Sequence, residues 1–140
     1  MKKSILILFL FGCIQMNAQS VLGKWKTIDD ATGHAKSIVE IYERDGKVYG
    51  KVIDILNPSL KNGVCEKCGK DYKNKPILGM VIITGMQKDG DEYNGGKILD
   101  PQSGNIYKCI IKLSGKDKLD VRGYMGFALI GRSQTWLRVK

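Results

Sequence analysis

The residues of this chain that could do chemistry are few, and the most closely spaced are the two cysteines of Cys65-Glu66-Lys67-Cys68. A pair with this spacing can close a structural disulfide, hold a metal ion, act as a redox pair or stay reduced. A metal clip would need two further ligands, and only Cys109 and His34 remain for that role in the chain expected after processing. A redox pair normally opens a helix in a thioredoxin-type unit, and no such unit is indicated here. We therefore favour a Cys65–Cys68 disulfide.

The other polar residues do not form a catalytic set. The single histidine, His34, follows Gly33 in an expected turn. Asp29, Asp30 and Asp100 also fall at expected turns, where aspartate is favoured because its side chain bonds to the local backbone. No glycine-rich loop leads into a helix, as a phosphate-binding loop would. We therefore expect no enzyme activity, no metal site and no cofactor.

The elements that must position these residues are strands. From Gly23 onward, runs rich in Val, Ile and Tyr alternate with turns that bear Gly, Asp or Pro, which is typical of an antiparallel all-β fold. Glycines within or beside several strands permit the bends that closure requires. We predict one domain over residues 19–140, an up-and-down antiparallel β-barrel of about eight strands. The expected strands are 22–28, 35–44, 47–56, 79–88, 92–99, 105–114, 118–125 and 128–139.

Two hairpins give a register that a structure can test. One turns at Asp45-Gly46 and the other around Gly115 to Asp117. In both, the expected pairing gathers apolar side chains on one face and charged ones on the other, so the apolar face should point inward. The expected pairs are Val39–Val52, Glu40–Lys51, Ile41–Gly50 and Tyr42–Tyr49 in the first hairpin, and Cys109–Gly123, Ile111–Val121 and Leu113–Leu119 in the second.

The N-terminus predicts export. Met1-Lys2-Lys3 is basic, the stretch from Ile5 to Phe11 is apolar but too short to span a bilayer, and Ala18 is a small residue suited to cleavage. This order is typical of a secretory signal peptide over residues 1–18, so we expect a periplasmic or secreted protein without a membrane span. Processing as a lipoprotein at Cys13 is the minor alternative.

The charge pattern argues against nucleic acid as a partner. The formal net charge is +9, and the mature chain would carry +7 because Lys2 and Lys3 leave with the signal peptide. Basic residues are spread along the chain with acidic ones between them, whereas nucleic-acid proteins more often show a basic stripe with interleaved aromatics. We favour a solvated surface with a mild attraction to an anionic envelope component.

Two short motifs resemble those of lipocalins: Gly23-Lys24-Trp25 opens the first expected strand, and Trp136-Leu137-Arg138 ends the last. In lipocalins, the tryptophan of a Gly-x-Trp motif plugs one end of the barrel and a late arginine packs across it. The resemblance therefore implies that Trp25 and Arg138 close one end. We expect no C-terminal helix of the lipocalin kind, because the sequence stops at Lys140, and the Thr-Asp-Tyr motif of lipocalins is absent.

A broader resemblance covers nearly all of the expected mature chain. Its motifs are similar to those of the secreted bacterial family called domain of unknown function 2147. The family resemblance implies a lipocalin-like barrel in the bacterial envelope and no established activity. The motifs are Cys65-x-x-Cys68, Lys73-Asn74-x-Pro76-Ile77-x-Gly79-Met80, Gly95-Gly96-x-Ile98-x-Asp100-Pro101, Leu119-x-Val121-Arg122-Gly123-Tyr124 and Gly131-Arg132-x-Gln134-Thr135-Trp136-x-Arg138.

The interior of such a barrel is wide enough for packed side chains or for one small ligand. Gly50 and Gly123 remove side chains from the expected inner wall, and Tyr107 and Asp54 offer polar anchors, as small-molecule sites require. By alternation, the wall consists of Trp25, Val39, Ile41, Val52, Tyr107, Ile111, Leu119, Val121 and Met125.

We therefore predict a protein that carries or senses a small hydrophobic or amphiphilic molecule. The candidate ligand residues are Tyr107, Asp54, Arg122 and Tyr124, although alternation places Arg122 outside, where it could form part of a mouth or an anion site. The alternative is a packed barrel that acts as an interaction module for an envelope partner. A thiol-active protein is a third possibility, and it would need a low thiolate pKa in the cysteine pair.

Overall fold

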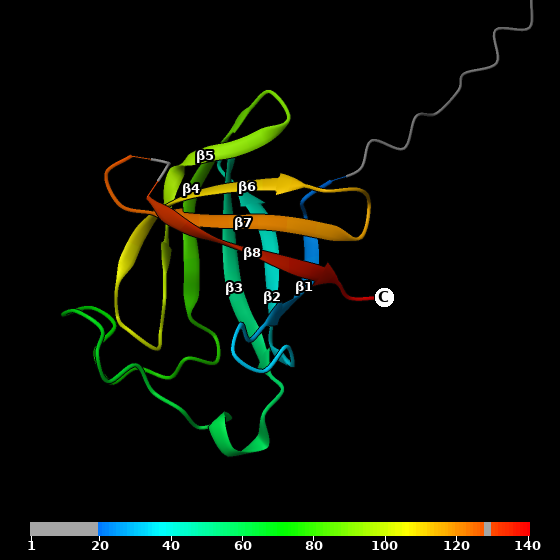
Figure 1. Ribbon diagram of the computed structural model, residues 1–140. Helices are drawn as coiled ribbons and strands as arrows, with labels where there is room; N and C mark the ends of the chain where they lie inside the picture. Colours follow the sequence, from blue (N-terminus) through cyan, green and yellow to red (C-terminus); the bar gives the residue numbers. More distant parts are fainter. Residues whose placement is uncertain (1–19, 128–129) are drawn as a thin grey trace, which may run out of the picture.

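The computed structural model describes residues 20–127 and 130–140, and these form a closed antiparallel barrel of eight strands (Figure 1). Each strand pairs with the next, and β8 pairs with β1. Within the described residues there is no α-helix, only a 3-10 turn, η1 (Pro58–Leu60). The strands are β1 (Gly23–Ile28), β2 (Ala35–Arg44), β3 (Lys47–Ile55), β4 (Val81–Asp89), β5 (Glu92–Leu99), β6 (Ile106–Leu113), β7 (Lys118–Tyr124) and β8 (Gly131–Arg138). The predicted up-and-down barrel is confirmed. The predicted signal peptide, with Cys13 in it, lies outside the described residues.

The turn between β2 and β3 shows how local sequence sets the register. Asp45 and Gly46 both adopt positive φ angles, 52° and 76°, as a two-residue hairpin turn of the I′ type requires. Glycine and aspartate tolerate this conformation better than most residues. The rings of Tyr42 and Tyr49 stack with their centroids 5.9 Å apart on the outer face. Every pair predicted for this hairpin and for the hairpin between β6 and β7 is confirmed.

Apolar side chains fill the barrel over most of its length. The glycines of the inner wall accommodate bulky neighbours: a Cβ atom on Gly50 would lie 3.1 Å from Ile83, and one on Gly96 would lie 2.6 Å from the sulfur of Met86. The space that Gly50 leaves opposite Ile41 is therefore occupied. Met125, predicted to line the wall, is 52% exposed, so that prediction was wrong. The largest fully buried side chains are Trp25, Val39, Ile41, Cys65, Ile83, Met86, Cys109, Ile111 and Leu119.

The two ends of the barrel differ in their connections. At one end, which we call the hairpin end, short turns join β2 to β3, β4 to β5 and β6 to β7, and the segments before β1 and after β8 also lie there. At the other, the loop end, the connections are 29–34, 56–80, 100–105 and the segment between β7 and β8. The longest of these, 56–80, extends away from the strands (green in Figure 1). An up-and-down barrel therefore presents one compact end and one end with larger loops.

Candidate functional site

The hairpin end is closed by Trp25 and Arg138. The Trp25 side chain is fully buried, and its Nε1 donates a hydrogen bond of 2.8 Å to the carbonyl oxygen of Val21. The guanidinium carbon of Arg138 lies 4.2 Å from the centre of the Trp25 ring. The same guanidinium donates to the carbonyl oxygens of Ser20 and Lys116, each at 2.8 Å. The buried ring, covered by a hydrogen-bonded cation, closes the barrel interior at this end.

The loop end carries polar side chains on its inner face. Residues that pair across antiparallel strands share a face, and β7 pairs with β8 through Leu119–Trp136, Val121–Gln134 and Gly123–Arg132. Leu119 and Val121 are buried in the interior. Four side chains of β8 therefore face inward. From the hairpin end to the loop end, they are Arg138, Trp136, Gln134 and Arg132.

These β8 side chains join a residue of the 29–34 loop in one polar chain, which we call the mouth network (Asp30, Arg132, Gln134 and Trp136). Trp136 is buried, and its Nε1 donates to Oε1 of Gln134 at 3.2 Å. Nε2 of Gln134 donates to Oδ2 of Asp30 at 2.9 Å, and the Arg132 guanidinium forms an ion pair with the same carboxylate oxygen. The network thus runs from the barrel interior to its rim.

Further polar groups lie on the inner wall at the same end. Thr27 is buried, and its hydroxyl shares a hydrogen bond of 2.7 Å with the hydroxyl of Ser37. Tyr107 is half-buried and lies over Gly123, where an added Cβ atom would be 3.4 Å from the Cβ of Tyr107. The Tyr107 hydroxyl accepts a hydrogen bond of 3.2 Å from Asn105. The loop end therefore offers polar groups above an apolar floor.

The predicted ligand residues are not brought together. Tyr107 lies on the inner face at the loop end, but Arg122 and Tyr124 lie on the outer face of β7, because their neighbours Val121 and Gly123 point inward. Nη1 of Arg122 donates to the hydroxyl of Ser133, also on the outer face, at 3.0 Å.

Asp54 is displaced by a β-bulge. The register between β2 and β3 shifts so that Val39 pairs with Val52 but Ile38 pairs with Asp54, which leaves Ile53 as the extra residue. Ile55, and not Asp54, then takes the buried position. Asp54 shares the outer face with Ile38 and accepts a hydrogen bond from the backbone N–H of Ile55.

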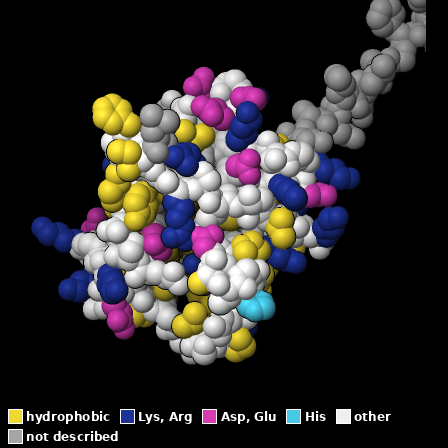
Figure 2. Space-filling view, viewed as in Figure 1, with side chains coloured by type: hydrophobic (Ala, Val, Ile, Leu, Met, Phe, Trp, Pro, Cys, Tyr) yellow, Lys and Arg dark blue, Asp and Glu magenta, His cyan; other side chains and the backbone are white. Residues whose placement is uncertain are grey.

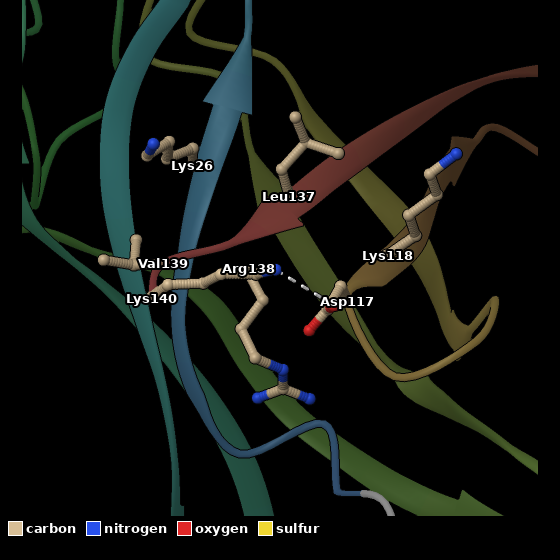
Figure 3. A pocket seen from close by; sticks show the side chains of 7 residues that line it. All are labelled: Lys26, Asp117, Lys118, Leu137, Arg138, Val139 and Lys140. Carbon is tan, nitrogen blue, oxygen red and sulfur yellow. Dashed lines mark ion pairs between the residues drawn. The ribbon is translucent and has the colours of Figure 1, made fainter.

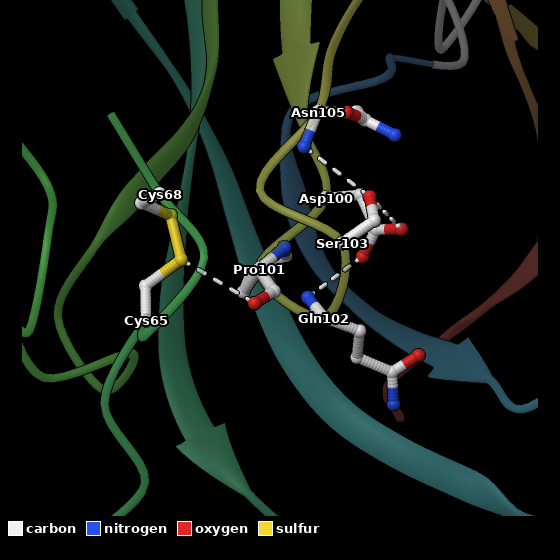
Figure 4. The surroundings of a disulfide bond; sticks show 7 residues. All are labelled: Cys65, Cys68, Asp100, Pro101, Gln102, Ser103 and Asn105. Atoms are coloured by element: carbon white, nitrogen blue, oxygen red, sulfur yellow. Dashed lines mark hydrogen bonds between the residues drawn. A yellow bond between two sulfur atoms is a disulfide. The ribbon is translucent and has the colours of Figure 1, made fainter.

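The cysteine pair forms the predicted disulfide, in the 56–80 connection (Figure 4). This bond uses both thiolates that a metal clip would have needed. The Cys65 sulfur lies 3.3 Å from the carbonyl oxygen of Pro101 in the loop between β5 and β6, a contact without a proton because the sulfur is disulfide-bonded. A Cβ atom on Gly104 of the same loop would overlap the backbone of Lys67. The disulfide loop therefore packs closely on the 100–105 loop.

Two pockets lie on the outside of the barrel. The larger, of about 370 Å³, is at the hairpin end beside β1 and β8, and an ion pair between Lys140 and Asp117 crosses it (Figure 3). The smaller, of about 60 Å³, lies between Tyr72 and the outer faces of β4, β5 and β6. Residues of the larger pocket are Lys26, Asp117, Lys118, Leu137, Arg138, Val139 and Lys140.

The outer surface mixes both signs of charge, and on the face shown in Figure 2 the Lys and Arg side chains lie among Asp and Glu. Hydrophobic side chains gather at one edge of that face. Among the described residues, three strongly exposed hydrophobic side chains come from the segment that joins β7 to β8: Met125, Phe127 and Ile130, at 52, 78 and 67%. The loop end thus has an apolar rim on one side.

Among the residues that the structure describes, two groups have a pKa shifted from the ordinary value. Burial raises the pKa of the Cys109 thiol to about 12, which keeps this free cysteine protonated. The backbone N–H groups of Thr32 and Ala31 donate to the Asp29 carboxylate and hold its pKa below the usual value. Asp29 therefore fixes the turn of the 29–34 loop, as expected for aspartate at a turn.

Across residues 20–127 and 130–140, no cluster of three or more His, Cys, Asp or Glu side chains could hold a metal ion. None of the helical segments in these ranges is long and apolar enough to cross a membrane.

Sequence reasoning missed the mouth network. The sequence places Asp30 at an expected turn, and Arg132 and Gln134 belong only to a family-like motif. The signal that could have found two of them is the alternation along the last strand, since Arg132 and Gln134 are spaced in steps of two from the core residue Trp136.

The comparisons agree with this architecture. Residues 23–138 match the model of the family described as "uncharacterized protein conserved in bacteria (DUF2147)". No curated protein sequence matches the chain. Among solved structures, the chain is similar to HP1028 from the human pathogen Helicobacter pylori, which is described as belonging to the lipocalin family. The two are 22% identical and superpose with a TM-score of 0.76 over 86% of this chain and 84% of that one.

Proposed function

Because the chain belongs to the DUF2147 family of uncharacterized bacterial proteins and folds as a lipocalin-like barrel, we propose that it is an exported protein that binds a small hydrophobic or amphiphilic molecule. The binding site is the loop end of the barrel. The protein carries or senses this molecule and performs no chemistry on it.

The observation that carries this proposal is the difference between the two ends. Trp25 and Arg138 close the hairpin end, whereas the inner face at the loop end bears the polar groups of Gln134, Tyr107 and Thr27 above buried apolar side chains. An apolar wall with a few convergent polar groups is what small-molecule sites have in common. The site therefore suits a molecule with an apolar body and a polar head.

The apolar body of the ligand would lie in the half of the barrel nearer the loop end. Nearer the hairpin end, Ile41 and Ile111 are buried in the interior. Nearer the loop end, the Tyr107 side chain occupies the space that a side chain at position 123 would fill. Its Cβ and Cγ atoms are 3.4 and 3.6 Å from the Cβ position of Gly123. A rotation of the Tyr107 side chain would open this space. Tyr107 is the residue from the sequence analysis that we retain as a ligand contact.

Export of the protein is part of the proposal. Residues 1–18 have the order of a signal peptide, and the disulfide between Cys65 and Cys68 suits an oxidising compartment such as the periplasm. The basic surface would favour contact with an anionic envelope component.

A role without catalysis is supported by the few reactive groups. The single histidine, His34, is exposed in the 29–34 loop. The free thiol of Cys109 is buried and holds its proton.

The test is native mass spectrometry of the mature protein, residues 19–140, purified gently from a bacterial periplasm. We expect a discrete extra mass that organic solvent releases. A Gly123→Leu variant should lose this mass, because the new side chain fills the space beneath Tyr107. A Lys108→Leu variant, which adds the same side chain to the exposed outer face of β6, should keep it.

A bare protein that also gains no mass on addition of fatty acids or other amphiphiles would refute the proposal. That result would favour an interaction module with a packed barrel, which the exposed Phe127 and Ile130 would serve.

A further inference from the structure

We propose that Arg132 and Gln134 form a binding site for the carboxylate headgroup of the ligand, and that Asp30 occupies this site when the barrel is empty. This inference rests on the proposed function, since it names the chemical class of the molecule that the loop end would bind. The ligand would be an amphiphile with an apolar tail and a terminal carboxylate.

The first argument is the position of the two donors. Arg132 and Gln134 lie on the inner face of β8, opposite Gly123 and Val121. Arg132 is at the rim with a side chain that is 70% exposed, and Gln134 is half-buried one step lower. The next inward residue, Trp136, is buried in the apolar interior. A cation, an amide and an aromatic ring thus follow one another from solvent to core, which matches the order of headgroup and tail.

The second argument is that a carboxylate already occupies the site. Oδ2 of Asp30 accepts a hydrogen bond of 2.9 Å from Nε2 of Gln134 and pairs with the guanidinium of Arg132. Arginine is well suited to pairing with a carboxylate, and here the guanidinium and the amide reach the same carboxylate oxygen. The contacts of Asp30 therefore show that these two donors can bind a carboxylate.

The third argument is that the loop does not need Asp30 for its own conformation. The turn of residues 29–34 is held by Asp29, whose Oδ1 accepts from the backbone N–H groups of Ala31 and Thr32 at 2.8 and 3.1 Å. The backbone N–H of Asp29 also donates to the carbonyl oxygen of His34 at 2.9 Å, and the N–H of Gly33 donates to the carbonyl oxygen of Asp29 at 2.7 Å. Asp30 can leave its partners without unfolding the loop.

The fourth argument concerns the seam between β1 and β8. The two strands pair through Trp25–Arg138 and Lys26–Leu137 near the hairpin end, whereas β7 and β8 pair over seven residues each. Towards the loop end, the side chain of Asp30 links the loop after β1 to β8. The carboxylate of Asp30 is 41% exposed, and an ion pair with that access to water contributes little to stability. A ligand carboxylate can therefore replace it at small cost.

The test uses dodecanoate and dodecanol as probes for the mature full-length chain. At about pH 8 the acid is ionised, so the two probes share a tail and differ in the charge of the head. Affinities are measured by titration calorimetry below the concentration at which the probes aggregate. Circular dichroism of each variant confirms that it is folded.

We expect dodecanoate to bind more tightly than dodecanol. Arg132→Gln should weaken dodecanoate by about tenfold, the value of one charge-assisted hydrogen bond, and should leave dodecanol unchanged. Asp30→Asn should strengthen dodecanoate several-fold because it removes the competing carboxylate. The indole N–H resonance of Trp136, which reports on Gln134, should shift on addition of dodecanoate.

The matched controls lie at the opposite end of the barrel. Arg44→Gln and Asp45→Asn make the same charge changes at the turn between β2 and β3, where both side chains are exposed. These variants should bind both probes as the unchanged protein does, which separates a local effect from an effect of net charge.

Each result either supports or overturns a stated part of the proposal. Equal affinity for dodecanoate and dodecanol, or an equal effect of Arg132→Gln and Arg44→Gln, would overturn the carboxylate site and leave the proposed function standing. Tighter binding of dodecanoate with no gain from Asp30→Asn would overturn the role of Asp30. Binding of neither probe would overturn the proposed function and this inference with it.

Discussion

Replacement of Arg138 tests whether the hairpin end is held shut by its guanidinium. In Arg138→Met the side chain keeps much of its length and apolar surface but loses the cation and all donors. In Arg138→Lys the charge remains and the planar fork is lost. The structure predicts that both variants are destabilised and that the methionine variant loses more.

The magnitude follows from the contacts of this side chain. Nε donates to the carbonyl oxygen of Lys116 and Nη2 to that of Ser20, each at 2.8 Å. Nη1 donates to the carbonyl oxygen of Leu22 at 3.3 Å. Each of the two short bonds contributes about 1 kcal/mol net where water can replace it, and the cation over the Trp25 ring adds about 0.5–1 kcal/mol. Arg138→Met should therefore lower the free energy of unfolding by about 3 kcal/mol, and Arg138→Lys by about half of that.

The assay is urea unfolding followed by circular dichroism at room temperature, with the disulfide intact. A loss of this size should also lower Tm by roughly 10 °C in a domain of this length. Arg44→Met is the control, because Arg44 is an exposed arginine whose side chain is 75% accessible and which pairs only at 3.8 Å with its neighbour Asp45. Its variant should stay within about 0.5 kcal/mol of the unchanged protein. An Arg138→Met variant that loses less than about 1 kcal/mol, or no more than Arg44→Met, would refute the closure that we infer.

Three further predictions concern a loop contact, a thiol and a carboxylate. Gly104→Ala should destabilise the protein by about 2 kcal/mol or more in the same urea assay, since the glycine has a φ of 74° and a Cβ atom there would overlap the backbone of Lys67. The control is Gly69→Ala, whose new methyl group meets no atom within 4 Å and which should be close to neutral. Cys109 should resist alkylation by iodoacetamide at about pH 8 and react only after unfolding, because burial raises its thiol pKa to about 12; rapid labelling of the folded protein would show that this thiol is accessible. The pKa of the Asp29 carboxyl, followed by NMR, should lie below its ordinary value of 3.8. Its bonds to the 29–34 loop then stabilise the folded state above that value, and this contribution is lost as the pH falls through the lowered pKa; an unshifted Asp29 would contradict the turn geometry.

The hairpins could be predicted to the residue because their information is local. Asp45-Gly46 permits one tight turn, and the alternation on both sides of it then determines which residues face each other. The same holds for the hairpin between β6 and β7, where Leu113 pairs with Leu119. Closure into a barrel followed from the number of hairpins and the glycines, and it is confirmed by the pairing of β1 with β8.

The positions that strict alternation misplaced lie where alternation is interrupted. The bulge at Ile53 moves the buried position from residue 54 to Ile55, so an anchor at Asp54 points away from the interior. Met125 follows the last residue of β7, where the chain leaves the wall and its side chain becomes exposed. A bulge changes the face by one residue, whereas a strand end takes the next side chain off the barrel wall.

The two neighbouring aspartates of the 29–34 loop show why the mouth network could not be predicted from the sequence. Residue types alone assign Asp29 and Asp30 to the same turn role. Asp29 has that role, because its partners lie within three residues of it. The amide partner of Asp30, Gln134, is 104 residues away and comes within reach only when β8 closes against β1. The polar mouth is therefore a product of barrel closure, and any ligand that binds there must compete with the contacts that complete the closure.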